Sequence, residues 1–376
     1  AVGAGTPPTA ADLARFTFGP AARLVFVDGR FMPHLSAPGE LPQGVVVGSL
    51  AEAIDATPGE LEPHLGRHAR LSDHPFVALN TAFLRDGAFV RLPRGVVLEH
   101  PIHILYYTRQ PAGGGAPICF PRNLLIAGPD SQVKLVETYA GAGAYFNCAV
   151  TELVAGPGSV IDHYKVQRES REGFHIATFQ ILGERASHLS SHSISIGGSI
   201  VRNDVNAVLD GEGIDCILNG LYLAEGRQLV DNHMRVEHRK PHCDSHELYK
   251  GILDGQARSV FNGLIHVLPG AQKTDAKQSN RNLLLSAGAI ANSNPQLEIF
   301  ANDVKCTHGS TVGQLDDDAV FYLRSRGIGL EAARSLLTYA FASDIVERIR
   351  VEPVRRDLEE FLFSRLPQGE VVRQAV

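Results

Sequence analysis

Two stretches in the middle of the chain carry the same short pattern. Leu209-Asp210-Gly211 leads to Asn219-Gly220-Leu221, and Leu253-Asp254-Gly255 leads to Asn262-Gly263-Leu264. Equivalent positions are 44 residues apart between 209 and 253, and 43 apart between 219 and 262. Because fixed periods of 20 to 50 residues are typical of stacked repeat folds, we read this spacing as two coils of about 22 residues each. The repeat alone leaves two folds open: a β solenoid, and a β-sandwich that contains two similar hairpins.

The character of the sequence changes near residues 95 and 314. Before 95, Asp28-Gly29 predicts a hairpin over 23–31, and short helices are predicted at 50–56 and 74–85. Beyond 95, short runs of strand character alternate with Gly, Asn and Asp, as in all-β folds. We therefore predict three units: a mixed helical and hairpin domain (1–95), a β-helix core (96–313) and a C-terminal helical domain (314–376).

Composition excludes several classes of protein. The net charge of −6, with no Lys/Arg cluster, argues against nucleic-acid binding. No apolar run approaches the 18 or more residues of a transmembrane helix, so a membrane partner is not expected. The odd number of widely spaced cysteines, five in all, predicts a reducing compartment, which we take to be the cytoplasm. Because the sequence does not begin with Met, a removed targeting segment and a plastid location stay open.

The segment 296–327 changes from strand to helix character. Leu297 and Ile299 alternate with polar residues, and Cys306 and His308 follow on a second predicted strand. Residues two apart on a strand share a face at roughly 6.5 to 7 Å, so a thiol lies beside an imidazole. Asp316–Asp318 then precede an apolar helical run, which they are expected to cap.

The C-terminal region has a helical period. Leu330, Leu337 and Phe341 belong to a series of apolar residues spaced three and four apart, which predicts an amphipathic helix over 330–349. Pro353 ends it, and a further helix contains Leu358. The apolar faces of these helices must be buried on one another, on the solenoid or on a partner.

At this point the sequence resembles a known family. The string VKCTHGSTVGQLDDDAVFYLRSRGI, residues 304–328, is similar to the C-terminal signature of the SufD branch of the SufB/SufD family, which takes part in iron–sulfur cluster assembly in the SUF system. Further similarity lies at 24–31, 95–103 and 278–284. The resemblance implies a right-handed parallel β-helix in a non-catalytic scaffold subunit that contributes to cluster assembly and iron acquisition.

The resemblance also implies a role for the Cys-x-His pair. Members of this branch are thought to meet SufB where the two β-helices end, and His308 matches the assembly-site His while Cys306 matches the neighbouring Cys. Thiolate and imidazole both suit iron, and two ligands from one chain require others from a partner. The implied cofactor is a transient iron–sulfur cluster in the complex, with none tightly bound to the isolated chain. Flavin in the complex is left open.

A second implied partner is SufC, an ABC-type ATPase that binds the C-terminal helices. The candidate contact residues are Tyr322, Arg324, Arg326, Leu330, Leu337 and Phe341. The chain has no phosphate-binding G-x-x-x-x-G-K-[ST] loop, so ATP hydrolysis is expected in the partner. A homodimer of the isolated chain is left open.

The densest group of metal-ligand residue types lies elsewhere. It consists of His233, His238, His242, Cys243 and His246. Their spacing matches no zinc-finger or H-E-x-x-H pattern, and Pro241 argues against a helix that would align them. We favour structural roles for these residues over a metal site.

Two other functions compete with the scaffold. A β-helix carbohydrate-active enzyme would need convergent carboxylates, but three consecutive acids at Asp316–Asp318 point in different directions and are better explained as helix caps. A homodimeric β-solenoid binding protein without a cluster role is the other alternative.

Overall fold

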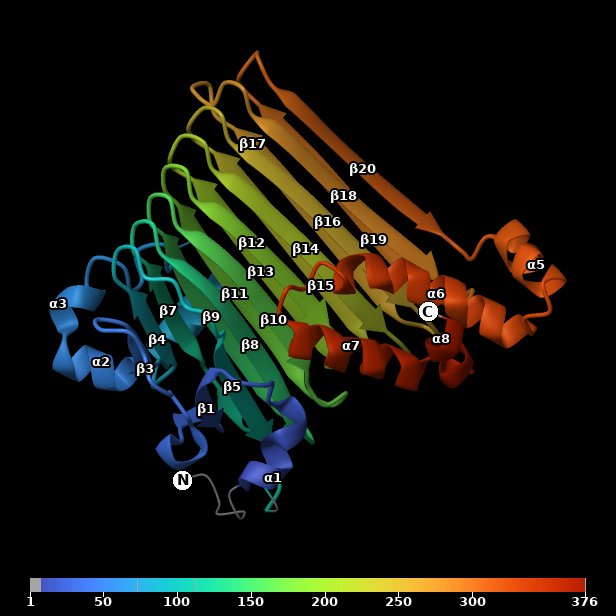
Figure 1. Cartoon of the computed structure of the whole chain (residues 1–376), viewed down its shortest axis with the longest axis horizontal. Helices are drawn as coiled ribbons and strands as arrows, with labels where there is room; N and C mark the ends of the chain where they lie inside the picture. The colour runs from blue at the N-terminus through green and yellow to red at the C-terminus, as the bar shows by residue number, and fades with distance from the viewer. Residues whose placement is uncertain (1–7, 73, 112, 376) are drawn as a thin grey trace.

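The computed structural model describes residues 8–72, 74–111 and 113–375. Its strands form two long, mainly parallel sheets that face each other (Figure 1). Sheet A contains, in spatial order, β2 (Arg30–Phe31), β1 (Ala22–Val27), β5 (Ile102–Arg109), β8 (Gln132–Ala142), β10 (Val160–Arg168), β12 (His188–Ser195), β14 (Asp215–Ala224), β16 (Asp244–Leu253), β18 (Asp275–Leu284) and β20 (Lys305–Gly313). Sheet B contains β19 (Ile290–Ile299), β17 (Arg258–Val267), β15 (Leu229–His238), β13 (Ile200–Leu209), β11 (Phe174–Gly183), β9 (Phe146–Ala155), β7 (Arg122–Ala127), β4 (Ala88–Leu92) and β3 (Val46–Ser49), with β6 (Ile118–Cys119) paired to β9.

The chain alternates between the two sheets and so winds into a solenoid. From β7 to β20, consecutive strands lie in opposite sheets, and each pairs in parallel with the strand two positions along the chain, as β13 pairs with β15 and β14 with β16. The inward side chains of one coil stack on those of the next. The predicted parallel β-helix is confirmed.

The predicted coil length of about 22 residues is wrong. Ile200 pairs with Leu229, and Asp215 pairs with Asp244, so one coil advances 29 residues. Each of the coils formed by β13 to β16 holds two ten-residue strands and two short turns, and the 44-residue repeat is therefore about one and a half coils. This is why Leu209 ends a strand of sheet B whereas Leu253 ends a strand of sheet A.

The N-terminal region joins the sheets directly. The predicted hairpin is confirmed as β1 and β2, with Phe26 opposite Phe31, and Asp28 and Gly29 both take positive φ values of 51° and 75°, as a type I′ turn requires. Strand β1 continues sheet A in parallel with β5, and β3 closes sheet B against β4 in the antiparallel sense. The domain division at residue 95 stays a prediction.

Eight α-helices and two 3₁₀ turns flank the sheets in the part of the chain that the structure describes. They are α1 (Ala10–Leu13), η1 (Ala14–Phe16), η2 (Pro33–Leu35), α2 (Leu50–Ala56), α3 (Pro58–Leu61), α4 (Pro75–Ala82), α5 (Asp317–Ser325), α6 (Leu330–Val346), α7 (Glu352–Arg365) and α8 (Gly369–Ala375). The helix predicted over 50–56 is confirmed, and the one predicted over 74–85 ends three residues earlier. Among the described helices none has the length and apolar character needed to cross a bilayer.

The last helices pack on the outer face of sheet A (Figure 1). Ile345 of α6 and Leu358 of α7 share one buried cluster with Tyr164, Leu221 and Ile252 of the sheet. The Nζ atom of Lys250 lies 2.8 Å from the Asp344 carboxylate and donates to the Phe341 carbonyl at 3.0 Å. The apolar faces of α6 and α7 are thus covered largely by the chain itself.

Candidate functional site

The solenoid is open at its C-terminal end. Strands β19 and β20 are the last members of sheets B and A, and no other strand among the described residues pairs with their outer edges (Figure 1). Large apolar side chains are exposed here, namely Ile290, Ile299, Phe300 and Val312. An unpaired edge with exposed apolar residues is typical of an interaction surface.

The two edges differ in what they offer a new strand. In a parallel ladder, successive residues direct their N–H groups to opposite sides. Ile290 and Phe300 donate to β17, so Pro295, of opposite parity, occupies a position whose N–H group would face outwards. Lys305 of β20 donates to Thr274, so Cys306 and His308 direct their backbone groups outwards. Proline prevents pairing at the middle of β19, whereas β20 has no proline.

Cys306 and His308 lie on the lumen face of β20. They pair in register with Ala276 and Gln278 of β18, which are both buried. Cys306 is half-buried against Leu297 and a small apolar cluster, and this burial raises the pKa of its thiol. His308 is exposed because no coil lies above it. The structure therefore brings the two side chains to one face at the rim of the lumen.

A buried polar column lies directly beneath His308. The Nε2 atom of Gln278 donates to Oε2 of Glu247 at 3.0 Å, and burial raises the pKa of Glu247 to about 8. Gly263 across the lumen leaves room for this amide, since a Cβ there would come within 2.4 Å of it. The Oε1 atom of Gln278 is buried without a hydrogen-bond partner. Gln278 is the residue of β18 that pairs in register with His308 of β20, so this free acceptor belongs to the coil directly below His308.

Sequence reasoning missed this column and a second one deeper in the lumen. Lys165 is buried, its Nζ donates to Asn203 at 2.7 Å, and burial lowers its pKa to about 8. Glu137 and His163 lie in the same coil region, 3.4 Å apart. Successive side chains of a strand point to opposite faces, so every second residue lies inside the solenoid. The sequence does not show which of the two faces is the inner one, because polar residues occur on both.

The proposed docking residues divide into two groups. No residue of α5, which the structure describes in full, is buried, and Tyr322, Arg324 and Arg326 are exposed. Leu330, at the start of α6, is also exposed. Leu337 and Phe341 are half-buried, and the Phe341 ring lies 4.6 Å from Lys250 Nζ. Phe321, 72% exposed, is a further apolar residue of α5 that sequence reasoning missed.

The acidic run before α5 forms a cap. The Asp316 side chain accepts a hydrogen bond from the backbone N–H of Asp318 at 2.9 Å, and Asp317 and Asp318 occupy the first turn. The predicted capping role is confirmed, and it accounts for these carboxylates without a catalytic function.

The five candidate zinc ligands of the central strands are dispersed. His233 faces outwards and pairs with Asp231 at 2.9 Å, whereas His238 is buried and contacts Ser245 Oγ at 2.9 Å. His242 lies in a turn with positive φ, Cys243 is buried with its Sγ near the Gly211 carbonyl at 3.1 Å, and His246 lies on β16. No three His, Cys, Asp or Glu side chains within the described residues converge on a common metal position.

Comparison with known proteins identifies the family. Residues 109–341 match the model of the SUF system FeS cluster assembly SufBD core domain, and residues 20–104 match the SufBD protein N-terminal region. An iron–sulfur cluster assembly SufBD family protein of Synechocystis is 34% identical over 92% of this chain and 78% of its own length. The iron–sulfur cluster assembly protein SufD of Escherichia coli is 31% identical over 92% of this chain and 80% of its own length.

A more distant relative comes from a plant. Protein ABCI7, chloroplastic, of Arabidopsis thaliana is 29% identical over 88% of this chain and 71% of its own length. The matches to the two family models together cover both the N-terminal region and the solenoid, including the strand that carries Cys306 and His308. The chain therefore belongs to the SufBD family of iron–sulfur cluster assembly proteins.

Proposed function

We propose that this chain is a non-catalytic scaffold subunit of the SUF complex and that it pairs with a SufB subunit through the open end of its solenoid. One observation carries the proposal. Cys306 and His308 lie together at the lumen rim of β20, the last strand of sheet A, whose outward backbone groups are unpaired in the part of the chain that the structure describes. A companion strand on this edge would cover both side chains.

The chemistry of the pair suits nascent cluster assembly. Thiolate and imidazole bind iron, and the partner would supply the ligands that complete its coordination. Because burial raises the pKa of the Cys306 thiol, iron binding there would release a proton. The iron–sulfur cluster is transient cargo in this scheme rather than a resident group.

The second proposed contact is with the SufC ATPase. Helix α5 and the first turn of α6 present the exposed side chains Phe321, Tyr322 and Leu330, flanked by Arg324 and Arg326. Aromatic residues and arginines are enriched at protein interfaces. We assign the docking surface to this group and not to the faces of α6 and α7 that pack on sheet A.

All five cysteines are free, which fits a reducing compartment, either the cytoplasm or a plastid.

Anaerobic co-expression with SufB and SufC tests the assembly role. His308→Ala should leave the purified complex intact but lower its iron and sulfide content at least tenfold. His188→Ala, which removes an exposed imidazole from β12, is the matched control and should retain the wild-type content. Unchanged iron and sulfide in the His308→Ala complex would remove His308 from the site. A chain that purifies as a homodimer and ignores the ATPase would support the binding-protein alternative.

A further inference from the structure

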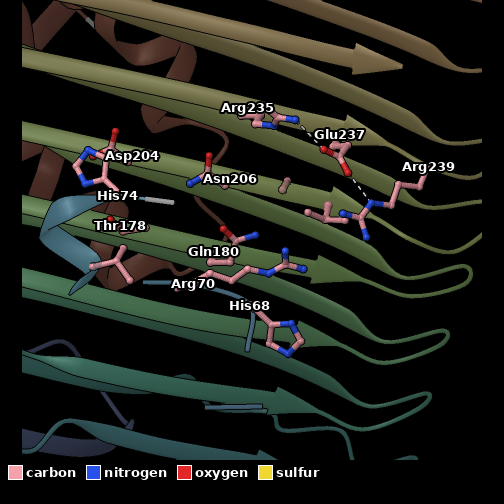
Figure 2. Close-up of a pocket in the computed structure, with 14 residues that line it drawn as sticks. His68, Arg70, His74, Thr178, Gln180, Asp204, Asn206, Arg235, Glu237 and Arg239 are labelled. Carbon is pink, nitrogen blue, oxygen red and sulfur yellow. Dashed lines mark hydrogen bonds and ion pairs between the residues drawn. The ribbon is translucent and has the colours of Figure 1, made fainter. Parts of the chain in front are cut away.

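A polar groove lies on the outer face of sheet B, far along the coils from the open end. Residues 68–70, together with His74 and Val77 at the start of α4, form one wall, and the outward side chains of β11, β13 and β15 form the floor. We call this cavity the outer groove; its volume is about 480 Å³. His74 and Asp204 mark one end and Arg235, Glu237 and Arg239 the other (Figure 2).

The floor of the outer groove carries amide groups that lack partners. Gln180 and Asn206 are neighbours in register on β11 and β13 and lie between the two charged ends (Figure 2). Gln180 is only 9% exposed, yet its side chain has no hydrogen-bond partner among the described residues. The Nε2 atom of His68, in the wall, is also buried without a partner. A buried polar atom without a partner is unfavourable, so His68 Nε2 is expected to bond to something that enters the groove, and the amides of Gln180 and Asn206 have donors and acceptors left for the same molecule.

Cationic side chains surround the amides. Arg235 and Arg239 share the Glu237 carboxylate, at 2.8 and 2.5 Å, and Arg239 also lies 3.4 Å from Asp210. Arg70 reaches into the groove from the wall (Figure 2), and no carboxylate within the described part of the chain pairs with it. Among the described residues, the three guanidinium groups at this end thus outnumber the two carboxylates, Glu237 and Asp210, by one.

We propose that the outer groove binds a small organic phosphate, with the phosphate group on Arg70 and Arg235 and the polar body of the molecule on Gln180 and Asn206. A guanidinium fork matches phosphate oxygens in two parallel hydrogen bonds. Side-chain amides both donate and accept, so they suit a sugar or a heterocycle. The volume lies within the range of about 300–1,000 Å³ usual for small-molecule sites. The proposal is independent of the assembly role.

Calorimetric titration of the full-length protein with adenosine monophosphate, ribose 5-phosphate and inorganic phosphate tests this site. At least one organic phosphate should bind, and more tightly than inorganic phosphate. Arg70→Met and Gln180→Met should each weaken this binding at least tenfold. Arg67→Met is the matched control because it removes an exposed arginine directly before the wall that does not line the groove, and it should leave the affinity within twofold.

The remaining outcomes each decide against the site. Absence of binding by both organic phosphates would overturn it. Inorganic phosphate that binds as tightly as the organic molecules would mean that the amides contribute nothing. Equal weakening by Arg67→Met and Arg70→Met would reduce the effect to general surface charge. Unfolding curves that match the wild type ensure that lost binding reflects the groove and not the fold.

Discussion

Glu247 makes the stability of the molecule depend on pH in an unusual direction. Burial raises the pKa of its carboxyl group from 4.5 to about 8 in the folded chain. Between these values the folded state keeps a proton that the unfolded state has released, so stability should fall as the pH rises from about 5 to 8. The slope is at most about 1.4 kcal/mol per pH unit for one group.

Glu247→Gln should remove this dependence. The neutral amide preserves the hydrogen bond from Gln278 and has no proton to lose. We expect a variant as stable as the wild type at pH 5 and more stable by a few kcal/mol at pH 8, as measured by urea unfolding. Glu298→Gln, which removes an exposed carboxylate from β19, controls for net charge. Parallel stability curves for Glu247→Gln and wild type would contradict the prediction.

Cys306 should be the thiol that reagents reach first. All five cysteines lie in the described residues, and four are buried while Cys306 is half-buried. Because burial raises the pKa of its thiol, labelling by a disulfide reagent should be slow at neutral pH and accelerate as the pH rises. Cys306→Ser should abolish this reaction, Cys148→Ser should leave it unchanged, and a bound SufB subunit should suppress it. Rapid labelling of the Cys306→Ser variant would refute this assignment.

Among the elements, locally determined features could be predicted and those set by packing could not. The Asp28-Gly29 hairpin and the Asp316 cap depend on a few adjacent residues, and both were predictable. The coil length was not, because similar turns end strands in both sheets and the sequence does not distinguish one sheet from the other. The residues around Cys306 and His308 could not be predicted for the same reason. The two residues are a recognisable pair in the sequence, but Gln278 lies below them only because β18 pairs with β20, which joins positions 30 residues apart.

The packing of α7 on the rest of the chain carries its own prediction. Leu358 is 2% exposed in the cluster that joins α6, α7 and sheet A. Leu358→Ala should lower the free energy of unfolding by about 2–5 kcal/mol, since it removes buried methyl groups and leaves a cavity. Urea unfolding gives the magnitude, and faster hydrogen exchange in α6 and α7 would locate it. Val371→Ala, at an exposed position in α8, should cost less than about 0.5 kcal/mol.

For the whole molecule, the unpaired edge of β20 is the feature on which the proposed pairing with SufB depends. Ser310 has the same parity as His308, so its N–H group faces the open edge and not β18. Ser310→Pro should leave the fold intact, because no ladder hydrogen bond within the chain is lost, but should block a companion strand. Co-purification with SufB should then fall at least tenfold, whereas Ser310→Ala should bind normally. Normal recovery of the proline variant would place the partner elsewhere.

The difference between the two ends of the solenoid bears on how many copies can assemble. At the N-terminal end, β2 and β3 each run antiparallel to their neighbours and so terminate the parallel stack. At the other end Pro295 obstructs one of the two edges. A stacked fold with matching ends would extend into a fibre, since each added unit exposes a fresh template. Because the two ends of this chain differ in this way, we expect the proposed pairing to end with one companion and not to continue into a fibre.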